Sequence, residues 1–245
     1  MTYIDILKSK SECNIVVLTG AGISAESGIK TFRDGNGLWE NHKVEDVATP
    51  EGFAANPSLV YKFYNERRAQ LLSGEVHPNP AHIALAELEK ALKSNIWIVT
   101  QNVDNLHERA GNQNVIHMHG ELASAKCAVT NQAQNWVAEL NASDRCHCCS
   151  PGTPLRPNIV WFGEIPYNME KIETLLFDAD LFVSIGTSGN VYPAAGFVSF
   201  ANQCNAYTLE LNLEPSNGQT QFAESRQGPA SELIPEFVSN CLKYL

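Results

Sequence analysis

The sequence lacks any apolar run long enough to cross a membrane. No stretch approaches the ~20 consecutive apolar residues that a spanning helix needs. The first residues, Met1 to Leu7, show no basic segment followed by an apolar core and a cleavage site. We therefore expect a cytoplasmic protein with neither a membrane helix nor a signal peptide.

Basic charge is also scarce. The 245 residues contain 17 Lys and Arg against 27 Asp and Glu, which gives a formal net charge of -10. Nucleic-acid binders usually present a basic stripe, so we expect no nucleic-acid partner. An acidic surface can instead attract cationic partners, including lysine-rich protein segments.

Internal repeats, low-complexity tracts and coiled-coil heptads are absent as well. The chain does have a hydrophobic content of 44%, which suits one large core with a small insert. Continuous apolar runs that end in glycine or polar residues are typical of buried parallel strands. Four such runs occur, at residues 14–19, 96–100, 181–185 and 206–211.

Helical patterns lie between these runs. Asn79-Pro80 and Asn56-Pro57 each place an N-cap asparagine before a first-turn proline, and the second pattern continues to about Leu72. After Pro80, apolar residues share one helical face at Ala81, Leu85, Leu88 and Leu92. Strands that alternate with helices predict an α/β fold with a Rossmann-type parallel sheet.

Two stretches interrupt this alternation. We expect residues 31–72 and 121–158 to form a smaller inserted domain, with a helical part and a zinc-knuckle-like module. Residues 1–30, 73–120 and 159–245 would then form the Rossmann-type domain.

The seven cysteines are unevenly placed. We expect three isolated ones to be buried as small hydrophobic residues: Cys13, Cys204 and Cys241. In a cytosolic protein, the remaining cluster predicts a metal site before it predicts disulfides. The candidate zinc ligands are Cys127, Cys146 and Cys149, with His147 as a fourth. The alternative is a relic knuckle that folds without metal.

A glycine-rich loop follows the first apolar run, at residues 20–28. Its glycines allow a phosphate to approach the backbone, and the following helix start offers free N–H groups. Only Gly20 and Gly22 fit a dinucleotide fingerprint, so an ordinary strand–turn–helix connection remains the alternative. The polar segment from Thr31 to Asp34 contains Phe32 and Arg33, which could cover a ribose and hold a phosphate, or lie in a surface loop.

Polar side chains also follow the second run. Gln101, Asn102 and Asp104 stand at the carboxyl end of a strand, where ligands bind in open α/β sheets. They could hydrogen-bond a carboxamide and ribose hydroxyls, or cap a helix. Further on, His117 and His119 alternate, and His119 is the better catalyst because the adjacent Gly120 leaves room for a substrate.

Tyr64 and Arg67 lie three residues apart on the helix that begins at Pro57, so they share a face. A phenol beside a guanidinium can bind a carboxylate. The alternative is a solvated face, since Arg68 follows.

In this order, the motifs resemble those of the sirtuin family, over nearly the whole chain. The matching segments are Gly20 to Ser24, Thr31 to Asp34, Gln101 to Asp104, His119-Gly120, Gly186 to Ser188 and Asn212 to Glu214. The resemblance implies an enzyme that consumes NAD to remove acyl groups from lysine, releasing nicotinamide and O-acyl-ADP-ribose. His119, with Asn102 beside it, would form the catalytic centre, and His119 would be the general base on a ribose hydroxyl.

The resemblance also implies the remaining site residues. The cofactor would be held by Gly20, Ala21, Gly22, Ile23, Ser24, Phe32, Arg33, Trp39, Gln101, Asn102, Val103, Asp104, Gly186, Thr187, Ser188, Asn212, Leu213, Glu214 and Ala230. The run from Ile159 to Glu164 would pair with the substrate backbone, and Val160 and Phe162 would line the acyl-lysine tunnel.

Within the family, Ala48, Tyr64 and Arg67 resemble the triplet of the class III branch. Ala48 would widen the acyl pocket, and the other two would bind the far carboxylate of succinyl- or malonyl-lysine. Desuccinylation is therefore expected beside deacetylation. The expected partners are acylated-lysine proteins or peptides, and the chain is expected to be a monomer. The main alternative is a protein mono-ADP-ribosyltransferase, and more distant ones are a dehydrogenase and an NAD-holding zinc-knuckle adaptor.

Overall fold

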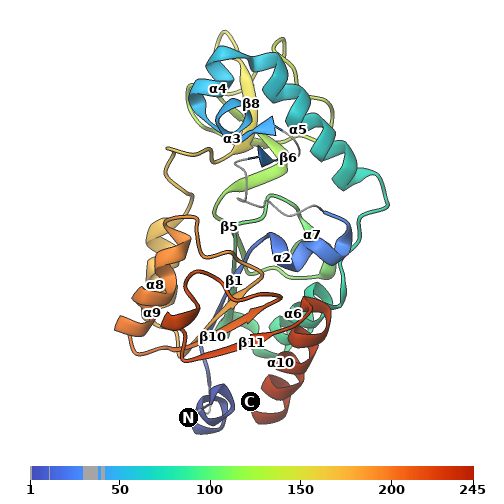
Figure 1. Ribbon diagram of the computed structural model, residues 1–245. Coiled ribbons are helices and arrows are strands. Elements are labelled where there is room, and N and C mark those ends of the chain that lie inside the picture. Colours follow the sequence, from blue (N-terminus) through green and yellow to red (C-terminus); the bar gives the residue numbers. More distant parts are fainter. Residues whose placement is uncertain (1, 11, 30–37, 40–41) are drawn as a thin grey trace.

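The computed structural model describes residues 2–10, 12–29, 38–39 and 42–245. Phe32 and Arg33 lie outside these ranges. The described chain forms two parts, a larger α/β part that carries both termini and a smaller part above it in the view of Figure 1. The domain boundaries expected from the sequence stay a prediction.

A parallel six-stranded sheet forms the centre of the larger part, in the order β11-β10-β9-β1-β4-β5. Its strands are β1 (Ile15–Thr19), β4 (Ile96–Thr100), β5 (Val115–His117), β9 (Leu181–Ile185), β10 (Tyr207–Asn212) and β11 (Glu224–Gln227). The four apolar runs are thus confirmed as strands, and so is the predicted Rossmann-type fold. Every residue of β1 is buried because helices cover both faces of the sheet.

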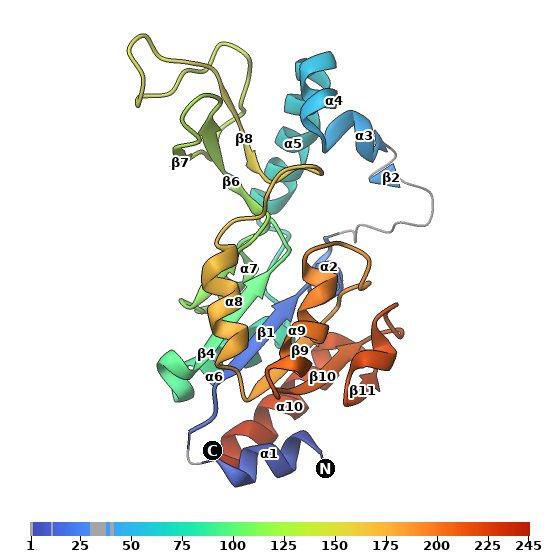
Figure 2. The same cartoon turned by 90° about the vertical axis from the view of Figure 1, so that its left-hand side faces the viewer.

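Different helices cover the two faces, as Figure 2 shows. On one face lie α1 (Tyr3–Ser9), α6 (Pro80–Leu92) and α10 (Ala230–Tyr244), and on the other lie α8 (Met169–Phe177) and α9 (Phe197–Gln203). The predicted start of α6 is confirmed, since Asn79 Oδ1 accepts a hydrogen bond from the Ala81 N–H. None of the described helices is long and apolar enough to cross a membrane.

The smaller part combines helices with an antiparallel sheet. The sheet has the order β7-β6-β8, formed by β6 (Gly120–Cys127), β7 (Ala133–Asn135) and β8 (Leu155–Ile159). Beside it lie the paired strands β2 (Leu38–Trp39) and β3 (His42–Lys43) and the helices α3 (Val44–Val47), α4 (Pro50–Ala55) and α5 (Pro57–Leu72). Asn56 caps α5 as predicted, by accepting from the Leu59 N–H at 3.1 Å.

Candidate active site

The carboxyl ends of the central strands meet at the edge of the sheet that faces the smaller part. The strand order changes direction at β1, since β4 pairs on one side and β9 on the other. Such a switch point is where open α/β sheets bind ligands. The segments that follow these strands carry the predicted cofactor residues.

Three glycines bring two of these segments into direct contact. The Gly22 N–H donates to the Gly186 carbonyl oxygen at 2.9 Å, and Gly186 adopts a left-handed φ of 62°. A Cβ atom at Gly22 would lie 2.6 Å from the Gly186 Cα, and one at Gly20 would lie 2.7 Å from the Gly186 oxygen. The glycines are therefore required for packing between the loops after β1 and β9.

A buried hydrogen-bond network joins the β1 loop to the end of β4. Asn102 Nδ2 donates to the Gly20 carbonyl at 3.1 Å and to Ser24 Oγ at 3.2 Å. Ser24 Oγ in turn donates to the Asp104 carboxylate at 3.0 Å. Burial raises the pKa of Asp104, although hydrogen bonds from Leu106 and Ser24 oppose the shift. The network fixes both segments in one orientation, and Asn102 does more than the helix capping considered above.

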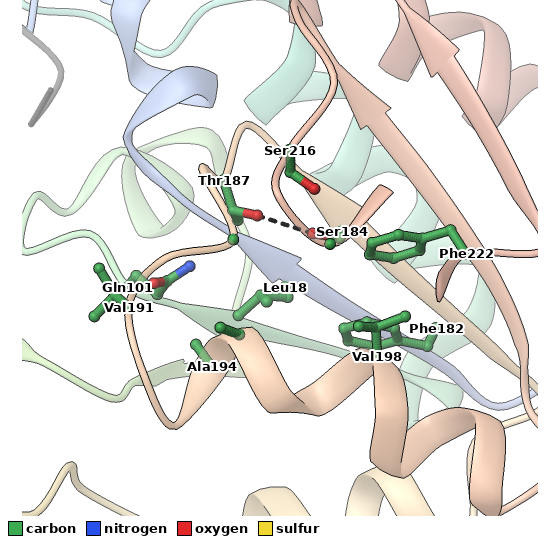
Figure 3. A pocket seen from close by; sticks show the side chains of 13 residues that line it. Leu18, Gln101, Phe182, Ser184, Thr187, Val191, Ala194, Val198, Ser216 and Phe222 are labelled. Carbon is green, nitrogen blue, oxygen red and sulfur yellow. Dashed lines mark hydrogen bonds between the residues drawn. The ribbon is translucent and has the colours of Figure 1, made fainter. Parts of the chain in front are cut away.

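Gln101 and Thr187 face a small hollow between the ends of β1 and β9 and the start of α9, drawn in Figure 3. Leu18, Val191 and Ser216 also line it, together with apolar side chains such as Phe182 and Phe222. Asn212 Nδ2 donates to the Thr187 carbonyl at 2.7 Å and so holds the edge of the hollow. Nearby Ser188, Leu213 and Glu214 are exposed, and Ala230 begins α10. This set of amides, hydroxyls and close-packed glycine backbone fits a dinucleotide.

His119 lies in the turn between β5 and β6, beside Gln101. Its Nδ1 is 3.1 Å from the Gln101 carbonyl oxygen. A carbonyl can only accept, so Nδ1 carries the hydrogen and Nε2 keeps a lone pair. Burial lowers the pKa of His119, so its ring is neutral at pH 7. Neutral imidazole with a free Nε2 can act as a base.

His117 has a different environment. Its Nε2 lies 2.7 Å from the Glu108 carboxylate, and its Nδ1 lies 3.2 Å from the Asn102 carbonyl oxygen. Burial is the largest single effect and lowers the pKa of His117, but the hydrogen bond to Glu108, the charges of Glu108 and Glu121 and the bond to Asn102 together leave the pKa raised. Both ring nitrogens are thus occupied, which fits a structural role.

Gly120 is needed for a reason that the sequence did not indicate. It has φ 83°, and a Cβ there would lie 2.0 Å from the Asn158 carbonyl oxygen. The glycine therefore lets β6 approach β8, rather than leaving room for a substrate as the sequence suggested.

The expected substrate segment lies against His119 and Ala48. The Val160 N–H donates to the His119 carbonyl oxygen, and the Phe162 N–H donates to the Ala48 carbonyl oxygen, each at 2.9 Å. Ala48 is buried, Val160 is half-buried and Phe162 is 47% exposed. The structure thus brings Phe162 beside Ala48, although more than a hundred positions separate them in the sequence.

Tyr64 and Arg67 lie on the buried side of α5. The Tyr64 oxygen accepts from the Trp161 indole N–H at 3.0 Å, and Arg67 Nη1 donates to the Phe63 carbonyl at 2.6 Å. Trp39 packs near both residues. The centroid of its ring lies 6.1 Å from that of Tyr64 and 5.9 Å from the Arg67 Cζ. The solvated face considered as an alternative is wrong, because the Arg67 side chain is only 13% exposed. Trp39, expected at the cofactor, thus contacts the two residues expected to select the acyl group.

The cysteines of the smaller part form one cluster. Sulfur atoms of Cys127, Cys146, Cys148 and Cys149 all lie within 4.8 Å of one another. Hydrogen bonds from Thr130 and Thr153 lower the pKa of the Cys127 thiol to about 5, which favours the thiolate that binds metal. Four thiolates suit tetrahedral zinc. The fourth sulfur comes from Cys148, and His147, the fourth ligand that the sequence suggested, lies outside this cluster.

Two of the isolated cysteines behave as expected. Cys13 and Cys241 are buried, whereas Cys204 is only partly buried.

Sequence reasoning also missed the partners of Trp161, because no local pattern relates it to Tyr64.

These features together define a Rossmann-type dinucleotide enzyme with an inserted, cysteine-bearing module. The Sir2 family model matches residues 20–193, and the chain belongs to that family. It is 60% identical over 231 residues to an NAD-dependent protein deacylase of Pasteurella multocida (strain Pm70), covering 94% of this chain and 99% of that one. Identity to an NAD-dependent protein deacylase of Escherichia coli (strain K12) is 58%, over 94% and 83% of the two chains.

Solved structures agree with this assignment. The chain superposes on a crystal structure of a Sir2 homolog–NAD complex with a TM-score of 0.86 and 35% identity, covering 98% and 93% of the two chains. It also matches Sir2Af2 bound to a myristoylated histone peptide, with a TM-score of 0.73, 30% identity and coverage of 98% and 94%.

Proposed function

We propose that this protein is an NAD-dependent protein-lysine deacylase that removes acetyl and succinyl or malonyl groups from lysine side chains. The observation that carries the proposal is the position of His119. Its imidazole is neutral, its Nδ1 is bonded to Gln101, and its own carbonyl holds the Val160 segment. One residue thus joins the cofactor segment, the base and the substrate segment.

The chain's own groups have distinct tasks. When NAD is bound, it supplies a ribose carbon that exchanges nicotinamide for the acyl oxygen, so the acyl group ends on ADP-ribose. His119 Nε2 would accept the proton of a ribose hydroxyl, because hydrogen bonding fixes the proton of the ring on Nδ1. Asn102 and Asp104 orient the ribose end, and the loops at Gly20 and Gly186 to Ser188 hold the phosphates through backbone N–H groups.

Selection of the acyl group falls to α5 and Ala48. Arg67 supplies a permanent positive charge and Tyr64 a neutral hydroxyl, which together suit the distal carboxylate of a succinyl chain. Small Ala48 leaves space beside them.

The remaining expectations also belong to this proposal. Cys127, Cys146, Cys148 and Cys149 would hold one structural zinc ion in the smaller part. Partners would be acylated-lysine proteins or peptides, with no nucleic acid, and the enzyme would act in the cytoplasm as a monomer.

Product analysis tests the function directly. The purified chain is incubated with acetyl- or succinyl-lysine peptide, with and without NAD, and the products are measured by mass spectrometry. We expect free lysine, nicotinamide and O-acyl-ADP-ribose in equal amounts, only with NAD. Transfer of ADP-ribose onto protein without acyl loss would instead identify a mono-ADP-ribosyltransferase and refute the proposal.

A further inference from the structure

Trp161 lies where the substrate segment meets the acyl pocket. Its side chain is 2% exposed, while the flanking Val160 and Phe162 face outward to a greater extent. Its indole N–H donates to the Tyr64 oxygen at 3.0 Å. The side chain of Trp161 thus reaches the residue proposed to bind the acyl carboxylate, although its backbone belongs to the substrate segment.

Arg156 and Glu164 hold Trp161 at its ring and at its backbone. The Arg156 guanidinium makes two bonds to the Glu164 carboxylate, at 2.7 and 2.9 Å, and lies 3.4 Å from the centre of the Trp161 ring. Glu164 also accepts from the Trp161 backbone N–H at 2.8 Å, and Arg156 donates to the Ile159 carbonyl at 2.9 Å. Such a paired guanidinium and carboxylate fix position strongly.

The direction of the bond between Trp161 and Tyr64 has a chemical consequence. Indole N–H can only donate, so it occupies a lone pair of the phenol oxygen and leaves the Tyr64 hydrogen to be donated elsewhere. Burial raises the pKa of the Tyr64 hydroxyl, which therefore keeps that hydrogen. A carboxylate only accepts hydrogen bonds, so a hydroxyl oriented in this way suits it.

Building on the proposed function, we propose that Trp161 is a positioning residue for acyl selectivity. Its indole N–H orients the Tyr64 hydroxyl as a donor to the distal carboxylate of an acyl chain, and Arg156 and Glu164 hold the indole in that place. Neutral acetyl groups offer no distal acceptor, so the bond between Trp161 and Tyr64 favours acidic acyl groups specifically.

The test replaces Trp161 in the full chain by benzothienylalanine, in which sulfur takes the place of the N–H and the ring shape is kept. KM and kcat are measured on succinyl- and acetyl-lysine peptides of the same sequence. We expect the ratio of succinyl KM to acetyl KM to rise about fivefold, on the scale of one neutral hydrogen bond, because the bond between Trp161 and Tyr64 joins two uncharged groups. The same replacement at Trp97, which lies on β4 away from the site, should leave this ratio as it is.

A double-mutant cycle with Tyr64→Phe separates orientation from simple packing. If the indole acts through the Tyr64 hydroxyl, replacing Trp161 in the Tyr64→Phe background should change the KM ratio by less than about twofold. Equal KM increases on both peptides, or effects of the two replacements that add fully, would overturn the inference. A wild-type chain that deacylates neither peptide would instead refute the proposed function itself.

Discussion

The Val160 backbone N–H donates to the His119 carbonyl oxygen at 2.9 Å. His119 belongs to the turn that ends the large sheet's β5, and Val160 follows β8 of the smaller part. This one bond therefore connects the proposed base to the proposed substrate segment. Movement between the two parts of the molecule would change the distance between base and substrate.

The protonation of His119 predicts the acid limb of the activity profile. Burial lowers its pKa, so the imidazole becomes protonated, and is lost as a base, only at a pH below the ordinary value of about 6.5. We expect kcat/KM on acetyl-lysine peptide to rise with pH with a midpoint below 6.5. His119→Ala should reduce NAD consumption by roughly 100-fold or more. A midpoint above 7, or unchanged NAD consumption in the variant, would contradict the assignment of the base.

Arg67→Met tests the carboxylate receptor. The variant keeps an apolar side chain of similar length but loses the guanidinium, whose Cζ lies 3.4 Å from the centre of the Phe63 ring and which would supply a charge-assisted contact worth roughly 1.5–3 kcal/mol. Steady-state kinetics should show desuccinylation falling far more than deacetylation. Lys62→Met is the matched control on the same helix, since its side chain is 76% exposed and points to solvent. Equal losses on both substrates would show that the pocket is misassigned.

Gly22→Ala tests the contact between the loops after β1 and β9. The new methyl group would lie 2.6 Å from the Gly186 Cα, where only backbone can yield. We expect roughly 1–3 kcal/mol of lost stability in denaturant titrations, together with a raised KM for NAD. Gly196→Ala is the control, because the atom nearest to its new Cβ would be 3.8 Å away and its φ of -84° suits any residue. Equal stability of the two variants would contradict the contact.

The cysteine cluster predicts a specific pattern of metal content. The wild-type chain should bind one zinc ion, and Cys148→Ser should weaken binding and lower the melting temperature. His147→Ala should do neither, because His147 is exposed and outside the cluster. Elemental analysis and thermal melts with and without chelator provide the measurements. Zinc loss in His147→Ala alone would restore the ligand set that the sequence first suggested.

Two buried histidines predict how stability depends on pH. His82 and His107 have ring centroids 5.0 Å apart behind the glycine loop, with Thr19 bonded to His107 and Asn79 to His82. Burial lowers the pKa of His82 to about 4 and lowers that of His107 as well, although Glu108 opposes the shift of His82. Both rings are therefore neutral in the folded chain, whereas the unfolded chain binds protons below about 6.5.

Because only the unfolded chain takes up these protons, acid favours unfolding. The two neutral rings cost no stability above pH 6.5, and the free energy of unfolding falls by roughly 1–3 kcal/mol as the pH drops toward 4. Melting temperatures between pH 7 and 5 measure the loss, and His82→Gln should make that dependence shallower. An identical pH dependence in the variant would show that other groups control acid stability.

The sequence by itself determined the strands, the helix starts and the family. Apolar runs such as residues 15–19 form central strands because both faces of a parallel sheet must be buried. Asn79 and Asn56 mark helix starts because their side chains bond to the first free N–H groups. These are local effects, so they can be predicted from neighbouring residues.

Only the tertiary structure decided which polar groups work together. His117 and His119 look alike in sequence, and Glu108, brought in by α7 (Leu106–Ala110), is what distinguishes them. Cys148 rather than His147 completes the sulfur cluster, because the direction of each side chain depends on the fold of the whole loop. Trp161 meets Tyr64 across 97 positions. Contacts of that kind depend on how two packed layers meet, which no local pattern encodes.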